Sequence, residues 1–542
     1  MSPIKFAVAV AIASAAATSA YALDASSSLA AGTVQIYVGG STAVDNTLLA
    51  TETALTTLGP GGMCQTGTID VYQIGNPSNR LTYCTGSASL PAGLANQPLA
   101  FFKESSVGSF NGPGPLVGIA TTPGPFTLNF LNAGTPGVAG SSQLTAANCP
   151  TVSSSDLGAN FNAFTLHQCN TSAGIVTPRN PTGGIADVEA NLLKDPNGRS
   201  FPANLIGQLS GAAGLDVVWG VGVTKNLYYA LQHAEHLDDG TVIAACNVAN
   251  NDSPACAPSM SKSQVASAYQ AVGLIGWNQI LGLSNPTGDN NVYLCRRDDG
   301  SGTEASFEAY FLGARCGGPT NPSGSKIVMP AEDGQFVFTS GSTGNVRNCL
   351  QAFFGGGNAT TSTGATVHEN GNQWAIGVLS SEVTAGNLVA SGSNLCNDCF
   401  RMVAVDGVLP TLANVANGYW PYWSTDVFYT TSTGPDAATG NPLAGFRAVQ
   451  GKMGHPAFTA ITNASFAGRP WGSGGDLAPA SVFAATNPPA IPATSATQAT
   501  NPTNGYTKAS TGGVSNCDTP VLQSGLNTPT QNNLLGSGNV NH

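Results

Sequence analysis

The stretch richest in groups that could bind a ligand is RRDDGSGTEASF, residues 296–307. It follows a predicted strand at residues 292–295 and opens a predicted helix that carries Phe307, Tyr310 and Phe311. A glycine turn lets the backbone approach a ligand closely, while the free N–H groups of a helix start, hydroxyls and an arginine all donate hydrogen bonds. Such a set of donors favours an oxyanion.

A purely structural role for the same turn stays open. Ser301 and Glu304 have the S-x-x-E spacing of a capping box, in which each side chain pairs with a free N–H group at the helix start. The glycines would then only shape the turn. Both roles can coexist, because a cap satisfies only some of the free donors.

A second turn of the same design, GGSTAV, occupies residues 39–44. A predicted strand at residues 33–38 precedes it, and apolar residues near helical spacing follow. Thr42 and Asp45 also fit an N-cap and the residue three positions later. Taken alone, this turn is more typical of a helix cap than of a binding site.

The surrounding chain predicts an α/β fold with mostly parallel sheets. Strand, glycine turn, helix and strand follow one another over residues 33–74, and the same rhythm returns with a strand at 215–223 and a helix at 263–269. Between them, about residues 111–210 are rich in Gly, Pro, Ser, Thr, Asn and Ala, which predicts a long loop-rich insertion. Residues 471–542 have the composition of an irregular tail.

The first 22 residues read as a signal peptide. One lysine precedes an alanine-rich apolar stretch, and small residues occupy Ala20 and Ala22, near which cleavage is expected. No later run reaches the roughly 20 apolar residues of a membrane span. We therefore expect a soluble exported protein, periplasmic or extracellular.

Composition limits the partners. The formal net charge is −11, with charged residues at only 9% of the chain, whereas nucleic acids and anionic membranes attract clustered Lys and Arg. We therefore expect neither as a partner. A small anion remains possible, because backbone N–H groups and helix starts act at contact range.

The 12 cysteines of an exported chain predict disulfides. Neighbours in sequence suggest Cys64–Cys84, Cys149–Cys169, Cys246–Cys256, Cys295–Cys316 and Cys396–Cys399. Cys349 and Cys517 are left over, and their pairing would tie the tail to the body. Proximity in sequence is the basis of this scheme.

Other chemistry is sparse. His233 and His236 form an H-x-x-H pattern on a predicted helix, which we interpret as a solvated face because no other metal ligand can be placed. No pair of nucleophile and base stands out, so we expect no catalytic residue and no enzymatic activity. We also expect no metal site and no cofactor.

Taken together, the motifs resemble the phosphate-binding proteins of ABC phosphate importers. RRDDGSGTEASF looks like their R-x-D-G-S-G-T segment, and GGSTAV sits where they have a first glycine and threonine loop. Weaker matches follow the family's order at residues 215–227, 260–281, 341–346, 374–378 and 418–422. The resemblance covers about residues 33–430, apart from the insertion.

The resemblance implies a two-lobed, periplasmic-binding-protein-like (type II) α/β fold with mixed sheets, hinged by strands that cross twice. Residues 33–103 plus 335–470 would form one lobe, and residues 104–334, with the insertion, the other. Phosphate or a similar tetrahedral oxyanion would bind between the lobes. An ABC importer membrane complex is an implied partner.

Carried over to this chain, the resemblance implies a set of ligand contacts. These are Ser41, Thr42 and Ala43 from the first loop, and Arg297, Ser301, Gly302 and Thr303 from the second. Asp299 would hold the Arg297 guanidinium, and Arg296 would be a peripheral neighbour. The family's G-A-S-D-A-P-like segment corresponds to residues 101–107, where Glu104 would accept the ligand's proton, Ser105 or Ser106 would donate, and Lys103 would add positive charge.

The expected function is therefore an exported solute-binding protein for phosphate, serving uptake or scavenging. The alternative is a secreted surface or matrix protein that uses the same fold for adhesion or assembly, which the low charge and the long Gly-, Ser-, Thr- and Asn-rich segments favour. A phosphatase is a third, weaker option.

Overall fold

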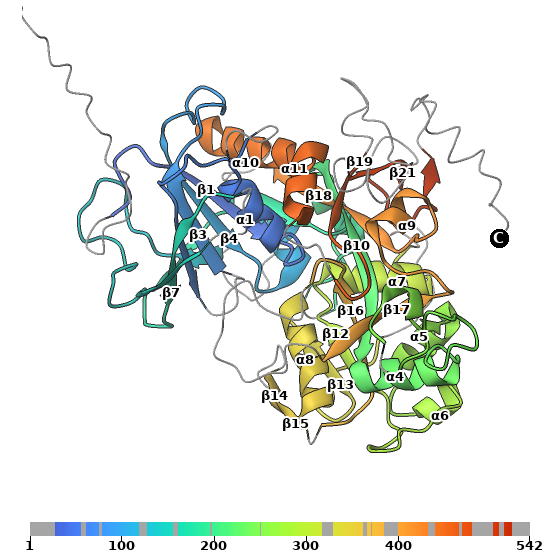
Figure 1. Ribbon diagram of the computed structural model, residues 1–542. Coiled ribbons are helices and arrows are strands. Elements are labelled where there is room, and N and C mark those ends of the chain that lie inside the picture. The colour runs from blue at the N-terminus through green and yellow to red at the C-terminus, as the bar shows by residue number, and fades with distance from the viewer. Residues whose placement is uncertain are drawn as a thin grey trace, which may run out of the picture.

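The computed structural model shows two lobes joined by long strands (Figure 1). It describes residues 28–55, 61–74, 79–118, 127–155, 161–195, 198–249, 251–316, 329–360, 366–369, 371–383, 399–431, 439–464, 469–479, 502–508 and 514–522. The expected signal peptide, residues 1–22, lies outside these ranges. Within them, no helix has the length and apolar character needed to cross a bilayer.

The first lobe is built on parallel strands from distant parts of the chain. β1 (Val34–Gly40) lies between β4 (Pro98–Glu104) and β9 (Gly183–Ala186), parallel to both. Beyond β4 the sheet continues through β3 (Asn79–Thr85), β2 (Asp70–Ile74), β7 (Phe164–Cys169) and β6 (Thr151–Ser155).

Both faces of this sheet are covered. On one face lie α1 (Asp45–Thr53), α10 (Gly440–Met453) and α11 (Pro456–Ala464), and Ile36 of β1 is buried there with Phe446 of α10. On the other face, the antiparallel pair of β5 (Leu128–Leu131) and β8 (Val176–Arg179) covers Phe102 of β4, which is buried together with Phe130 of β5. The short elements of this part of the chain are η1 (Gly108–Asn111), α2 (Pro113–Leu116), η2 (Ala190–Leu192) and α3 (Ala203–Ile206).

The second lobe is also built on a central strand that is parallel to both of its neighbours, and its strands come from later in the chain. β12 (Tyr293–Arg297) lies between β13 (Val337–Ser340) and β16 (Ala375–Ser380), parallel to both. The other elements are α4 (Lys225–Ala234), η3 (Pro254–Cys256), β11 (Ser259–Met260), α5 (Lys262–Gln270), α6 (Trp277–Ile280), α7 (Gly302–Leu312), α8 (Thr343–Gly355), β14 (Gly357–Thr360), β15 (Thr366–Glu369), β17 (Phe400–Val405) and α9 (Leu412–Ala416).

Two strands form the hinge between the lobes. The first half of β10 (Leu209–Thr224) pairs with β18 (Trp423–Thr431), and its second half pairs with β16 and β17 of the second lobe. The chain returns to the first lobe between β17 and β18, which pairs with β9. The expected two-lobed α/β class with mixed sheets and two crossings is confirmed.

The expected lobe boundaries differ from those observed. β13 and β16, within residues 335–470, pair with β12 of the second lobe rather than with β1. β9, within residues 104–334 and inside the expected insertion of about residues 111–210, pairs with β1, so part of that insertion is a central strand of the first lobe. The sequence shows that a segment is extended, but not which strand it will pair with.

Five disulfides are described. Cys64–Cys84, Cys149–Cys169 and Cys246–Cys256 agree with the scheme drawn from proximity. Two expected pairings are wrong: the bonds are Cys295–Cys349 and Cys316–Cys517. Cys295 on β12 meets α8, which packs against that strand, so spatial neighbours replace sequence neighbours. The Cys396–Cys399 pair cannot be compared, because Cys396 lies outside the described residues.

The chain beyond residue 471 is more ordered than its composition predicts. β19 (Asp476–Pro479) pairs with β10, and β20 (Thr503–Asn504) pairs with β19. Thr503 and Asn504 are fully buried. The last described elements, β21 (Tyr506–Thr507) and β22 (Val521–Leu522), pair with each other. The described parts of this segment therefore belong to the folded body.

Candidate functional site

The candidate site lies where strand ends from the two lobes meet. The carboxyl ends of parallel strands lie at the same edge of a sheet, so the residues after β1, β4 and β9 are neighbours. The turn after β12 faces this edge, because the Phe110 N–H donates to the Gly300 carbonyl over 2.9 Å. A Cβ atom on Gly302 would lie only 2.7 Å from the Cβ of Asp187, so the close approach of the lobes requires glycine there.

Asp187 is the carboxylate on which both lobes converge. It follows β9 and is 1% exposed. The Ser41 hydroxyl donates to its Oδ1, and the Thr303 hydroxyl lies 3.5 Å from its Oδ2. Burial raises the pKa of Asp187, while Ser41 and the Arg297 charge oppose that rise. A buried carboxyl group is thus held among hydroxyls from two lobes and beside a cation.

Arg297 is the last residue of β12 and is 2% exposed. Its Nε donates to the Ser340 carbonyl over 3.0 Å and its Nη2 to the Gly341 carbonyl, also over 3.0 Å. Its Nη1 contacts the hydroxyls of Thr303 (3.3 Å) and Thr343 (3.1 Å). Burial lowers the pKa of Arg297, and the Asp187 charge opposes this most. The turn between β13 and α8 therefore holds the guanidinium in place.

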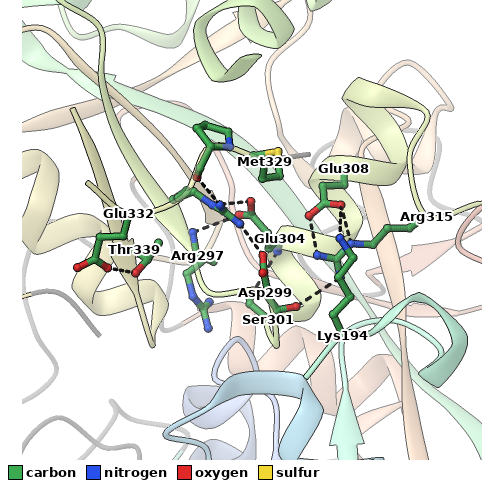
Figure 2. Close-up of polar contacts among 12 residues, drawn as sticks. Lys194, Arg297, Asp299, Ser301, Glu304, Glu308, Arg315, Met329, Glu332 and Thr339 are labelled. Atoms are coloured by element: carbon green, nitrogen blue, oxygen red, sulfur yellow. Dashed lines mark hydrogen bonds and ion pairs between the residues drawn. The ribbon is translucent and has the colours of Figure 1, made fainter. Parts of the chain in front are cut away.

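The expected pairing of Asp299 with Arg297 is wrong, because Asp299 contacts Arg296 (Oδ1 to Nη2, 2.8 Å). Arg296, expected to be a peripheral neighbour of the ligand site, is 4% exposed, and its Nε donates to Glu304 over 3.0 Å. Neighbouring residues of a strand point to opposite faces, so the two arginines have separate surroundings. Figure 2 shows the Arg297 guanidinium directed away from Glu304, whose carboxylate accepts the Arg297 backbone N–H (3.2 Å).

Ser301 is the N-cap of α7, and its Oγ accepts the Glu304 N–H over 3.4 Å. The expected cap therefore exists, but the reciprocal half of the box does not, because the Glu304 carboxylate binds Arg296 and the Arg297 N–H instead. Burial raises the pKa of Glu304 to about 7. Ser301, Gly302 and Thr303 are all buried in the first turn, next to Asp187.

The first loop differs from its expected form. The N-cap of α1 is Val44, with no side-chain cap, so the N-cap role expected of Thr42 is wrong. The loop is closed instead by Ser41, whose N–H donates to the Ile185 carbonyl (2.9 Å) and whose Oγ accepts the Ala43 N–H (3.2 Å). Within the described part of the chain, the buried Thr42 Oγ1 has no hydrogen-bond partner.

The segment after β4 supports this loop. Lys103 Nζ donates to the carbonyls of Gly40 and Ser41 (2.9 Å for the latter) and lies 3.0 Å from Asp45 Oδ1. The Ser105 hydroxyl donates to the other oxygen of Asp45 over 2.7 Å. These contacts place both side chains beside the start of α1.

Glu104 caps its own turn. Its Oε1 accepts from the N–H of Ser106 (3.0 Å) and from the Ser106 hydroxyl, and its Oε2 accepts from Asn111 (2.8 Å). Burial raises the pKa of Glu104, and the bonds from Ser106 oppose that rise most. The described side-chain hydrogen bonds of Glu104 and Ser105 run to Ser106, Asn111 and Asp45.

Asp187 is therefore absent from the contacts that the family resemblance implied. The run Gly183-Gly184-Ile185-Ala186-Asp187 forms β9 and the residue after it, and it is similar to the G-A-S-D-A-P-like segment that the resemblance assigns to residues 101–107. About 80 residues separate these two segments. The order of the family's motifs along the chain favours residues 101–107, because they come before the insertion-like stretch. A short glycine-rich strand ending in aspartate was the available signal.

Comparisons with known proteins give low similarity. No protein-family model and no curated protein matches the chain. Among solved structures, a putative phosphate ABC transporter substrate-binding protein with bound phosphate from Clostridium perfringens is 15% identical, with a TM-score of 0.29; the match covers 56% of this chain and 86% of that one.

Two further structures are similar at the same level. An ABC-type phosphate transport receptor from Vibrio cholerae is 11% identical (TM-score 0.26, covering 49% of this chain and 72% of that one). PstS from Borrelia burgdorferi is 12% identical (TM-score 0.24, covering 52% and 76%). What this chain binds therefore has to be inferred from its own contacts.

Proposed function

We propose that the chain is an exported solute-binding protein that holds inorganic phosphate between its lobes, for uptake or scavenging. The observation that carries the proposal is the convergence of Ser41, Thr303 and Arg297 on the buried carboxyl group of Asp187. Hydroxyls and a guanidinium suit an oxyanion, whereas the Asp187 carboxylate beside them suits the proton that the anion carries.

Each lobe would contribute donors to the anion. The first would supply the unpartnered Thr42 hydroxyl and, from the loop before α1, the Ala43 N–H, which in the structure bonds to Ser41 Oγ. The second would supply Arg297 and the first turn of α7, Ser301 to Thr303. Helix starts favour negative charge through their free N–H groups and the helix dipole. Binding of this kind involves no covalent step.

Asp187 would select between oxyanions. Phosphate near neutral pH retains a proton that can be donated to the carboxylate, whereas sulfate has none. A sulfate oxygen facing Asp187 would bring two acceptors together in a buried site with no proton between them, at a cost of about 1–3 kcal/mol or more. Delivery of phosphate to an ABC importer membrane complex would follow from this role, and we include that partner in the proposal.

Native mass spectrometry tests the proposal on purified, disulfide-intact protein. We expect an adduct of phosphate mass, and calorimetry after exhaustive dialysis should show one phosphate site and much weaker sulfate binding. Folded protein that retains no anion and gives no heat with phosphate would overturn it. Concentration-dependent polymers with an empty site would instead favour a structural role in a surface or matrix.

A further inference from the structure

The hinge strands β10 and β18 have the chain's own C-terminal segment along them (Figure 1). We call residues 469–479, 502–508 and 514–517 the C-terminal strap. On the side of β10, the strap strand β19 pairs with Asp216 and Val217, at the point where β10 leaves the first lobe. β20 then adds to β19, and its Asn504 donates to Asp216 over 2.8 Å.

The strap also occupies the edge of β18. Asn516 is 8% exposed, and its Oδ1 accepts the Thr425 N–H over 2.9 Å while its Nδ2 donates to the Thr425 carbonyl over 3.2 Å. The same Nδ2 lies 2.7 Å from Glu189 Oε2, and the Asn516 N–H lies 2.8 Å from Glu189 Oε1. This asparagine side chain therefore continues the ladder of β18 and ties it to the segment after β9.

A lysine reinforces the same contact. The Nζ atom of Lys508 donates to the Trp423 carbonyl and lies 4.6 Å from the centre of the Trp423 ring. Lys508 is 5% exposed. Trp423 is the first residue of β18. The strap therefore contacts that strand at the point where the chain returns from the second lobe to the first.

The strap is anchored in both lobes. In the first, the Thr47 hydroxyl of α1 donates to Asp476 over 2.6 Å. In the second, Arg469 donates to the Glu382 carbonyl (2.7 Å from Nη2) and Trp471 to the Ser381 carbonyl (3.1 Å), just after β16. The Cys316–Cys517 disulfide then ties the strap covalently to the segment just after α7, the helix whose first turn enters the candidate site.

We propose that the C-terminal strap holds the two lobes at a fixed angle, so that the bound anion leaves only when the strap detaches. Domain opening requires a few hinge residues to change their backbone angles. Here the strap pairs with an edge of β10 and of β18, and the Cys316–Cys517 disulfide links the strap to the second lobe. Each separation of the lobes must therefore break several buried contacts. Opening of this kind gates ligand release. The retention of phosphate rests on the proposed function, but the restraint on the hinge does not.

The test removes the crosslink with the double variant Cys316→Ser/Cys517→Ser. The matched control is Cys246→Ser/Cys256→Ser, which removes a disulfide within one loop of the second lobe. Hydrogen exchange of β10 and β18 in the ligand-free protein reports the hinge, and the dissociation rate of radiolabelled phosphate reports retention. We expect the first variant to raise both by about tenfold or more, because losing a native disulfide typically costs more than the ~1.4 kcal/mol that a tenfold change represents, and we expect the control to leave both unchanged.

A second variant, Asn516→Ala, keeps every disulfide and decides the question if the double variant does not fold. We expect it to change both rates in the same direction. Wild-type hydrogen exchange in β10 and β18 of the folded strap variants would overturn the restraint. Faster hydrogen exchange in β10 and β18 with an unchanged phosphate dissociation rate would show that the strap does not control phosphate release. If the wild-type protein binds no phosphate, the proposed function fails, but hydrogen exchange still tests the strap.

Discussion

The two loops that face each other across the candidate site share a sequence design but not a mode of support. The second loop is fastened by its own arginine, because Arg297 contacts two carbonyls and a hydroxyl of the β13–α8 turn, and Ser301 caps α7. The first is fastened from a neighbouring strand by Lys103, and it leaves the Thr42 hydroxyl unpaired within the described residues. Similar glycine turns can thus supply a preformed cation in one lobe and a free donor in the other.

The largest effect should come from Arg297→Ala. This residue is buried at a strand end, so its loss would remove the cation and take one hydrogen bond from each of the carbonyls of Ser340 and Gly341. We expect phosphate binding to be abolished and the free energy of unfolding to fall by about 3–5 kcal/mol. Calorimetry and urea denaturation measure the two effects. Wild-type stability in this variant would show that the second loop is not built around its arginine.

Lys103→Met should destabilise the first loop somewhat less. Asp45 and the carbonyls of Gly40 and Ser41 would lose a buried cation, for a cost of about 2–4 kcal/mol. Phosphate affinity should fall as well, although Lys103 is not among the proposed contacts. Urea denaturation checks the first effect. An unchanged midpoint would mean that the loop supports itself.

Acidic pH should stabilise the protein. Burial raises the pKa values of Glu304, Glu52 and Asp216 to about 7. The native state then holds more protons than the unfolded state between about pH 4 and 7, so this contribution is lost as pH rises through 7. We expect unfolding to become easier by at least about 1.4 kcal/mol, one pKa unit for one group, between pH 5 and 8.

Thermal denaturation across that pH range measures the effect. The variant Glu304→Gln should flatten the profile, because it removes the one raised carboxyl that belongs to the second loop. A stability that rises steadily from pH 5 to 8 would contradict the burial argument.

The smallest change in stability should come from Thr42→Val. Its buried hydroxyl has no partner in the described chain, so its removal costs little folding energy, within about 0.5 kcal/mol. Phosphate affinity should still fall by about tenfold, the effect of one hydrogen bond. Thr343→Val, at the start of α8, is the matched control, because its hydroxyl contacts Arg297 of the second loop and its loss should lower stability. Equal behaviour of the two variants would remove the distinction between the loops.

The sequence predicts this architecture better than its details. Glycines and hydroxyls before a helix have local signatures, so both loops and the α/β class could be found. The pairing of Cys295 with Cys349 depends on which helix covers β12, and Asp187 reaches the site only because β9 pairs with β1 across the insertion. These are long-range contacts. Asp299 likewise contacts Arg296 rather than Arg297, because the two arginines lie on opposite faces of β12.

The strap was hidden for a different reason. Its sequence is rich in Pro, Ala, Thr, Ser and Asn, which is typical of irregular segments. Its order comes instead from individual polar contacts, such as those of Asn504 and Asn516, with hinge strands formed elsewhere in the chain. Composition carries no information on such contacts.

The most direct test of the proposed site is the ratio of phosphate to sulfate affinity in Asp187→Asn, measured by calorimetry. The amide keeps the shape of the side chain but can donate a hydrogen bond to an unprotonated oxygen. We predict that the ratio falls by about tenfold or more relative to wild type. Asp195→Asn, which alters a buried aspartate paired with Arg199, should leave it unchanged. A wild-type ratio in Asp187→Asn would contradict the assignment of Asp187 as the group that selects phosphate.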